Sequence, residues 1–135
     1  MEQLYRRTRF GKRFARGDLV AFCDADDVVA PDWLEGLVAA AESADVVGGR
    51  LDIERLNDER WRALRPPPQP RPELHVSHGF LPYAAGCNMA VWRDVFDAVG
   101  DWREDYLRGY EDVELSWRAQ LASFTLAYAP DAVIH

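Results

Sequence analysis

The sequence has few cysteines, no long apolar run and no excess of basic residues. Cys23 and Cys87 are the only cysteines among 135 residues, which excludes a small disulfide-held scaffold and favours a reducing compartment. No run approaches the roughly 20 apolar residues that a membrane-spanning helix needs. Met1–Arg9 lacks the apolar segment of a signal peptide. A net charge of −7 excludes bulk electrostatic binding to nucleic acid or to an anionic membrane surface.

What is present suits one globular domain with a hydrophobic core, since 48% of the residues are hydrophobic and 29% are charged. We therefore expect a single α/β domain in the cytoplasm, covering residues 1–135. Five of the eight prolines lie between Arg65 and Pro72. Proline fits neither a helix interior nor a central strand. The sequence thus predicts a proline-rich loop, residues 65–82, within that domain.

Alternating strand-like and helical patterns predict the elements of the α/β domain. A short apolar run at 19–23 predicts a strand covered on both faces, as in a parallel sheet. Pro31 and Asp32 suit the first turn of a helix that continues to Ala41, and a strand at 45–49 completes a strand–helix–strand unit. The remaining expected elements are a surface helix at 2–15, strands at 89–92, 124–129 and 132–134, and helices at 94–99 and 111–121.

Three carboxylates directly follow the first predicted strand, in Asp24-Ala25-Asp26-Asp27. Ligands of open α/β sheets bind beyond the carboxyl ends of strands, where this motif lies. Because like charges repel one another, a hard divalent cation is the usual means of holding such carboxylates together. An acidic loop before a helix is the alternative. A calcium EF-hand loop is excluded, because Val28 and Val29 replace the required ligand and glycine and Pro31 interrupts the loop.

A second polar group consists of Gly86-Cys87-Asn88 and, after 22 intervening residues, Glu111-Asp112. An ionised carboxylate at a helix N-terminus can accept a proton from a hydroxyl group, although a simple helix cap is the alternative. His135 follows a predicted strand, where a lone histidine is either structural or a ligand. His75 and His78 do not predict a zinc site, because the flanking proline-rich loop offers no helix to align them.

Four ordered motifs, spread over nearly the whole chain, resemble the family 2 glycosyltransferases of the GT-A fold. They are Gly11-x3-Ala15-x-Gly17-Asp18-Leu19-Val20-x-Phe22-x-Asp24-Ala25-Asp26-Asp27, Gly86-x-Asn88-x-Ala90-x2-Arg93-x2-Phe96-x2-Val99-Gly100, Gly109-x-Glu111-Asp112-x-Glu114-Leu115-x2-Arg118 and Pro130-x-Ala132-Val133-Ile134-His135. The resemblance implies a nucleotide-diphospho-sugar transferase fold, with a mixed, mostly parallel sheet flanked by helices. It also implies an inverting, metal-dependent enzyme that moves a sugar from a nucleotide-sugar donor to an acceptor hydroxyl.

The resemblance further implies a role for each motif residue. Asp24 and Asp26 would face the donor and bind Mn²⁺ or Mg²⁺, with Asp26 the more direct ligand and His135 completing the metal shell. The ion would neutralise the diphosphate leaving group. Asp112 would be the general base for the acceptor hydroxyl. Glu111 and the loop of Gly86 and Asn88 would hold the donor or acceptor sugar, the acceptor being a saccharide, a lipid-linked group or another hydroxyl compound.

The chain also departs from the family pattern. Thr8 and Arg9 stand where the family often has Arg-Asn, so Arg7 and Arg9 are the expected contacts to the donor phosphates. The processive Q-x-x-R-W motif has no match, since Leu-Ala-Ser-Phe follows Gln120, and we expect one sugar per encounter. The family's opening strand and first βαβ unit have no counterpart here. We therefore expect an N-terminally incomplete catalytic domain that is inactive alone, with any attachment to the inner membrane surface made through other parts. An inactive remnant that serves as a binding module is the alternative function.

Overall fold

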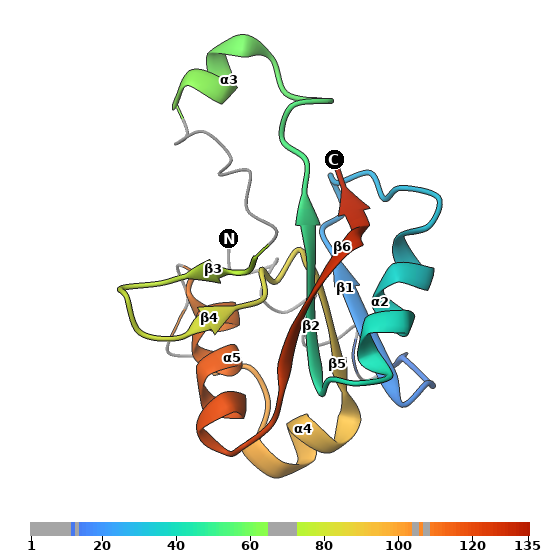
Figure 1. Ribbon diagram of the computed structural model, residues 1–135, viewed down its shortest axis with the longest axis vertical. Helices are drawn as coiled ribbons and strands as arrows, with labels where there is room; N and C mark the ends of the chain where they lie inside the picture. Colours follow the sequence, from blue (N-terminus) through green and yellow to red (C-terminus); the bar gives the residue numbers. More distant parts are fainter. Residues whose placement is uncertain (1–11, 13, 65–72, 104–105, 107–108) are drawn as a thin grey trace.

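A four-stranded mixed sheet forms the centre of the computed structural model, which describes residues 12, 14–64, 73–103, 106 and 109–135 (Figure 1). In the order β1-β5-β2-β6, the strands span Leu19–Cys23 (β1), Asn88–Trp92 (β5), Val46–Leu51 (β2) and Leu126–Ile134 (β6). β5 runs antiparallel to β1 and to β2, whereas β6 runs parallel to β2. The sheet is therefore mixed, with β5 as its one reversed strand. The predicted α/β class with a mixed sheet is confirmed.

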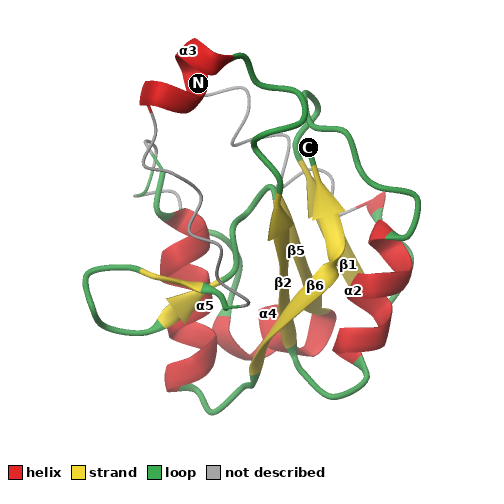
Figure 2. Cartoon of the chain, turned by 45° about the horizontal axis from the view of Figure 1, so that its top comes forward, coloured by secondary structure: helices red, strands yellow, loops and turns green. Residues whose placement is uncertain are grey.

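Helices cover both faces of this sheet (Figure 2). Helix α2 (Trp33–Ala41) lies on one face, and helices α4 (Arg93–Val99) and α5 (Glu111–Leu121) lie on the other. Side chains alternate along a strand, so Val46 packs toward α4 and α5 while its neighbour Val47 packs toward α2. Every helix in the described part of the chain is too short or too polar to cross a lipid bilayer.

Three elements of the structure, a helix and the two strands of a hairpin, were not predicted from the sequence. Helix α3 (Glu59–Leu64) lies away from the sheet, at the top of Figure 1. Strands β3 (His75–Val76) and β4 (Pro82–Tyr83) form a small antiparallel hairpin beside α5. Trp117 Nε1 of α5 donates a hydrogen bond to the carbonyl of Leu81, at 2.9 Å, which ties the hairpin to the helix. The predicted loop at 65–82 thus contains a hairpin in its second part, while 65–72 lie outside the described residues.

The last strand also differs from expectation, because β6 is one strand where the sequence predicted two. Its pairing with β2 jumps from Gly49–Ala129 to Arg50–Val133, so the residues around Pro130 bulge out of the ladder. Proline has no N–H for a ladder hydrogen bond, which explains why the irregularity falls there. A Cβ on Gly49 would lie 2.4 Å from the Ala132 carbonyl oxygen, so only glycine fits opposite the bulge.

The side chain of Asn88 holds this region together from the interior. It is 0% exposed. Its Nδ2 donates to the carbonyls of Arg50 on β2 and Ala132 on β6, both at 2.9 Å, and its Oδ1 accepts from Trp33 Nε1 of α2 at 2.8 Å. One buried amide therefore connects β5, β2, β6 and α2. The predicted sugar contact of Asn88 is not supported, because both amide hydrogens are used inside the protein.

We expect Asn88→Ala to lower the free energy of unfolding by roughly 2–4 kcal/mol, because the buried Ala132 carbonyl, the Arg50 carbonyl and the Trp33 indole N–H all lose their hydrogen bond to this side chain. Urea denaturation followed by circular dichroism measures this. Asn57→Ala is the matched control, since Asn57 is exposed. Equal stabilities of the two variants would contradict the assigned role.

Candidate functional site

The polar residues predicted from the sequence meet at one edge of the sheet, where β1 ends and β5 begins. Cys23 of β1 pairs with Asn88 of β5. These two strands are antiparallel. Asp24, which follows Cys23, and Cys87, which precedes Asn88, therefore lie at the same end of the strand pair. The reversed direction of β5 thus places the Gly86–Asn88 loop against the acidic loop.

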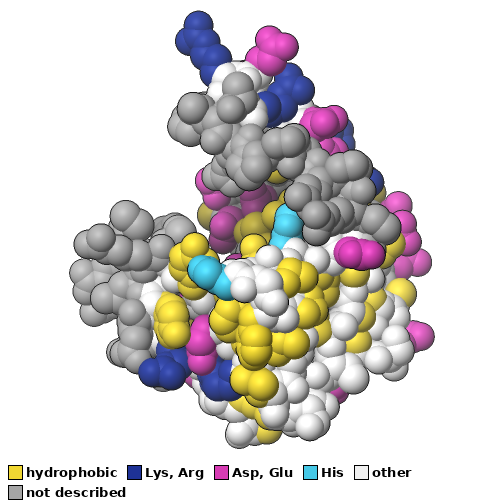
Figure 3. Space-filling model, turned by 60° about the vertical axis from the view of Figure 1, so that its left-hand side comes forward, with side chains coloured by type: hydrophobic (Ala, Val, Ile, Leu, Met, Phe, Trp, Pro, Cys, Tyr) yellow, Lys and Arg dark blue, Asp and Glu magenta, His cyan; other side chains and the backbone are white. Residues whose placement is uncertain are grey.

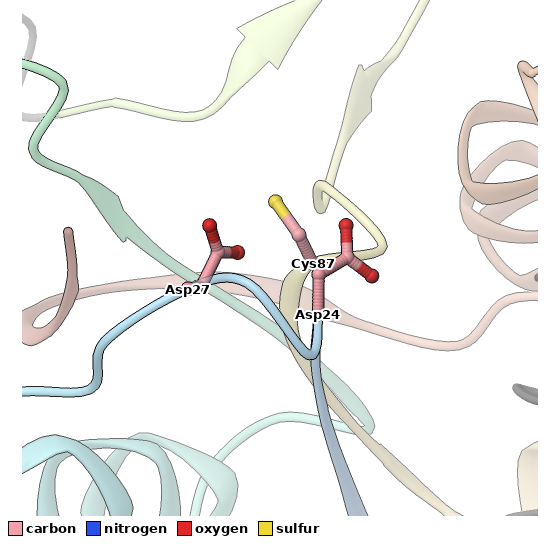
Figure 4. A group of neighbouring side chains, drawn as sticks. All are labelled: Asp24, Asp27 and Cys87. Carbon is pink, nitrogen blue, oxygen red and sulfur yellow. The ribbon is translucent and has the colours of Figure 1, made fainter. Parts of the chain in front are cut away.

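Asp24, Asp27 and Cys87 form a group whose ligand atoms all lie within 4.8 Å of one another (Figure 4). In Figure 4 the three side chains rise on the same side of the loop that follows β1. A tight turn brings the two aspartates together, with the amide of Asp27 donating to the carbonyl of Asp24 at 3.3 Å. Carboxylate oxygens suit Mg²⁺ or Mn²⁺, while the thiol adds a softer ligand.

The acidic loop is attached to the end of β6 by backbone hydrogen bonds. The amide of Val28 donates to the carbonyl of His135 at 2.9 Å, and the amide of His135 donates back to Val28 at 2.8 Å. The His135 imidazole is directed elsewhere: its Nδ1 lies 3.2 Å from Asp52 Oδ2, and its Nε2 lies 3.0 Å from Arg55 Nη1. His135 therefore holds the loop through its backbone, and its role as a metal ligand stays a prediction.

Asp112 approaches the same group from the N-terminus of α5. Its Oδ2 accepts a hydrogen bond from the amide of Gly86 at 2.9 Å, and its Oδ1 accepts one from the amide of Val113 at 2.8 Å. A Cβ on Gly86 would lie 3.3 Å from the Asp112 Cβ, so glycine lets the loop and the helix come this close. Two backbone N–H groups thus fix the carboxylate in one orientation, with lone pairs left to accept a proton.

Burial and mutual repulsion raise the pKa of several site groups. Burial raises the Asp24 pKa, and the charges of Asp26 and Asp112 raise it further. The Asp27 pKa is raised by burial and then by Asp24 and Asp26. Burial, followed by the charges of Asp27 and Asp24, raises the Cys87 pKa to about 12. The site therefore carries excess negative charge that a cation would neutralise.

Glu111 lies beside this group. Burial raises its pKa most, and Asp112 and Asp24 also raise it. Within the described part of the chain, its Oε2 is buried without a hydrogen-bond partner. A buried carboxylate oxygen of this kind is available to a ligand hydroxyl or to a cation.

The structure brings together most, but not all, of the residues predicted from the sequence. Asp24, Glu111, Asp112 and the Gly86 backbone meet at this edge. Asp26 is exposed and acts on both neighbouring aspartates through its charge. Asp27 and Cys87 were present in the quoted motifs but were not assigned roles. Asp27 and Cys87 are brought to the site by the antiparallel pairing of β1 with β5. A pattern of residues in the sequence does not reveal that pairing. Arg7 and Arg9 lie outside the described residues.

Residues 6–100 match the sequence profile of a family described as Glycosyl transferase family 2. No curated protein matches the chain. The matched range contains the acidic loop, the Gly86–Asn88 loop and β5, whereas Glu111 and Asp112 follow it.

We expect Asp27→Asn to stabilise the protein when no divalent cation is present. The pKa values of Asp24 and Asp27 are raised above 3.8, so their contribution to stability is full below that pH and is lost as the pH rises through the raised values. Removing one charge should raise the free energy of unfolding at pH 7 by about 0.5–1 kcal/mol, since water screens partly exposed charges. The gain should shrink towards about pH 4, where the wild-type carboxyls become protonated.

Urea denaturation in the presence of EDTA measures this difference at both pH values. Asp32→Asn is the matched control, because Asp32 precedes α2 without a side-chain capping hydrogen bond. A destabilised Asp27→Asn variant at pH 7 would show that Asp27 is held by favourable contacts instead of being strained by repulsion.

Proposed function

The chain belongs to glycosyl transferase family 2, and we propose that it moves a sugar from a nucleotide-sugar donor to an acceptor hydroxyl with inversion at the anomeric carbon. The observation that carries this proposal is the meeting of two carboxylate groups at one sheet edge. One group, Asp24 to Asp27, follows β1, and the other, Glu111 and Asp112, begins α5. The two groups are close enough for Asp112 to raise the pKa of Asp24.

The acidic loop would hold the donor diphosphate through a divalent cation. Asp24 and Asp26 are the ligands that the family resemblance implies, and the position of Asp27 beside Asp24 adds a third carboxylate. Their donor set fits Mn²⁺ or Mg²⁺, and crowding that raises the pKa values of Asp24 and Asp27 favours a bound cation. When bound, the ion supplies positive charge that stabilises the diphosphate as it leaves.

Asp112 is the proposed general base. Its carboxylate is oriented by the amides of Gly86 and Val113, and such fixed orientation is what proton abstraction requires. The acceptor hydroxyl would give its proton to Asp112 as its oxygen bonds to the anomeric carbon and the donor phosphate leaves. Glu111, with a buried and unpaired oxygen in the described structure, would accept a hydrogen bond from a sugar hydroxyl. The thiol of Cys87, whose pKa is about 12, stays protonated in the metal-free site and is a poor nucleophile.

Asp112→Asn should reduce turnover by roughly 10²–10⁴-fold, as removal of a general base typically does, while donor binding stays within about twofold of wild type. Asparagine keeps the shape of the side chain, although its single carbonyl oxygen can accept only one of the two hydrogen bonds that Asp112 accepts from Gly86 and Val113. Steady-state transfer rates and donor titration by calorimetry measure the two effects, in a version of the protein with the family's nucleotide-binding part restored, because the chain alone is expected to be inactive.

Asp94→Asn is the matched control, because Asp94 is also an acidic residue in the first turn of a helix, α4. Near-normal turnover of the Asp112 variant would show that Asp112 only caps α5.

Asp24→Asn and Asp26→Asn should each weaken Mn²⁺-dependent nucleotide-sugar binding by at least about tenfold, because each removes a charged ligand. Calorimetry with Mn²⁺ and a panel of uridine, guanosine and thymidine diphosphate sugars measures this. The Asp32→Asn control should bind as wild type does. Loss of binding in Asp27→Asn together with normal binding in Asp26→Asn would contradict the role of Asp26 and assign the cation to the group of Asp24, Asp27 and Cys87.

A further inference from the structure

Large side chains are exposed on the face formed by the β3–β4 hairpin and the N-terminal end of α5. Phe80, between the two hairpin strands, is 55% exposed, and Tyr110, directly before α5, is 58% exposed. Figure 3 shows hydrophobic side chains gathered on this side of the molecule, with histidines at their border and acidic side chains nearby.

The two exposed rings are supported from behind by other rings. Phe80 packs edge-on against Trp117 of α5, with ring centroids 5.0 Å apart. Tyr110 lies against His78 of the hairpin, with ring centroids 6.1 Å apart. The Phe80–Trp117 contact is edge-to-face, a geometry that orients a ring, whereas the rings of Tyr110 and His78 are tilted by 51° to each other. Each ring therefore offers solvent a flat surface that needs little reordering to bind a ligand.

Tyr110 and His78 also share an unusual backbone conformation. Their φ angles are 73° and 52°, in the left-handed region that side chains other than glycine rarely adopt. Residues held in this way cluster at ligand sites, where the surroundings maintain the strain. The two residues also contact each other through their rings. The fold therefore maintains local backbone strain at both residues of this pair.

One of these rings lies close to the proposed base along the chain. Tyr110 precedes Asp112 by two residues. Tyr83 of β4 links the hairpin to the base, because the charges of Asp112 and Tyr110 both act on its hydroxyl group and raise its pKa, after the larger effect of burial. Asp112 thus contacts the Gly86–Asn88 loop through its Oδ2, and its charge also acts on Tyr83 of the hairpin.

The charge of the site selects the kind of acceptor. Asp24, Asp26, Asp27, Glu111 and Asp112 gather at the edge of the sheet that the acceptor must reach. An anionic acceptor would be repelled by these carboxylates, whereas a neutral one would not. A saccharide ring has an apolar face of C–H groups and a rim of hydroxyl groups. This chemistry matches exposed rings beside hydrogen-bonding carboxylates.

We propose that Phe80 and Tyr110 form the acceptor subsite, on which a neutral saccharide stacks so that one of its hydroxyl groups reaches Asp112. This inference rests on the proposed transfer reaction for the identity of the bound molecule. It adds a substrate class, a neutral saccharide, and two residues that select it.

The test measures saccharide binding directly, with tryptophan fluorescence as the readout, because Trp117 lies against Phe80. Maltose, cellobiose and N,N′-diacetylchitobiose are titrated separately into the full chain. Variants Phe80→Ala and Tyr110→Ala remove a ring, while Phe80→Tyr and Tyr110→Phe keep it. Leu34→Ala is the matched control, since Leu34 is an equally exposed apolar side chain, at 55%, on α2.

We expect a saturable fluorescence change with at least one of the three disaccharides. The dissociation constant should rise by at least about tenfold in each alanine variant and stay within about twofold of wild type in the ring-keeping variants and in Leu34→Ala. In transfer assays, the alanine variants should raise the acceptor KM more than they lower kcat. Donor binding by calorimetry should be unchanged.

Three results would overturn the proposal: no saturable change with any disaccharide, equal binding by the alanine variants, or a shift from dimer to monomer in Phe80→Ala, which would make the face a contact between copies. Because saccharide binding is measured without donor, it can fail while metal-dependent donor binding persists. Loss of donor binding in wild type, with saccharide binding retained, would instead contradict the proposed function alone.

Discussion

The buried amide of Asn88 is the constraint on which the site geometry depends. It hydrogen-bonds to the carbonyls of Arg50 and Ala132 and to the indole of Trp33, so it fixes where β2, β6 and α2 sit relative to the start of β5. Gly49 leaves room for this contact, since a Cβ there would lie 2.4 Å from Asn88 Oδ1. A buried amide with its partners in place is specific, because any displacement leaves polar groups unpaired. The interior polar contact thus sets the position of the loop that carries Gly86 and Cys87.

Repulsion among carboxylates is the opposing force at the same edge. The acidic loop is fastened to β6 by two backbone hydrogen bonds between Val28 and His135, and Asp112 is held by the amides of Gly86 and Val113. The Val28–His135 contacts are main-chain hydrogen bonds that no side-chain substitution removes directly, and the donors to Asp112 are main-chain amides. The charges therefore stay close even though the pKa values of Asp24 and Asp27 are raised. A site assembled in this way is ready to bind a cation without rearrangement, which lowers the free-energy cost of binding.

The sequence predicted most of the sheet and helices because their patterns are local. The apolar run at 19–23 and the helical spacing of 111–121 appear as β1 and α5 with those bounds. The hairpin and α3 were missed, since two-residue strands and a short polar helix leave little periodicity to detect. The site was predicted in outline through its motifs. The partnership of Cys87 with Asp24 and the burial of Asn88 depend on strand register, which sequence patterns do not reveal.

The reversed strand explains why the candidate site residues from distant motifs share one edge. In a sheet of parallel strands only the carboxyl ends would contribute loops to that edge. Because β5 runs the other way, its amino end lies beside the carboxyl end of β1, and the chain enters β5 through the Gly86–Asn88 loop at the place where β1 delivers its aspartates. The segment before that loop is the β3–β4 hairpin, packed on α5 through Leu81 and Trp117. One strand reversal therefore brings together the acidic loop, Asp112 at the start of α5 and the side of the molecule that carries the β3–β4 hairpin.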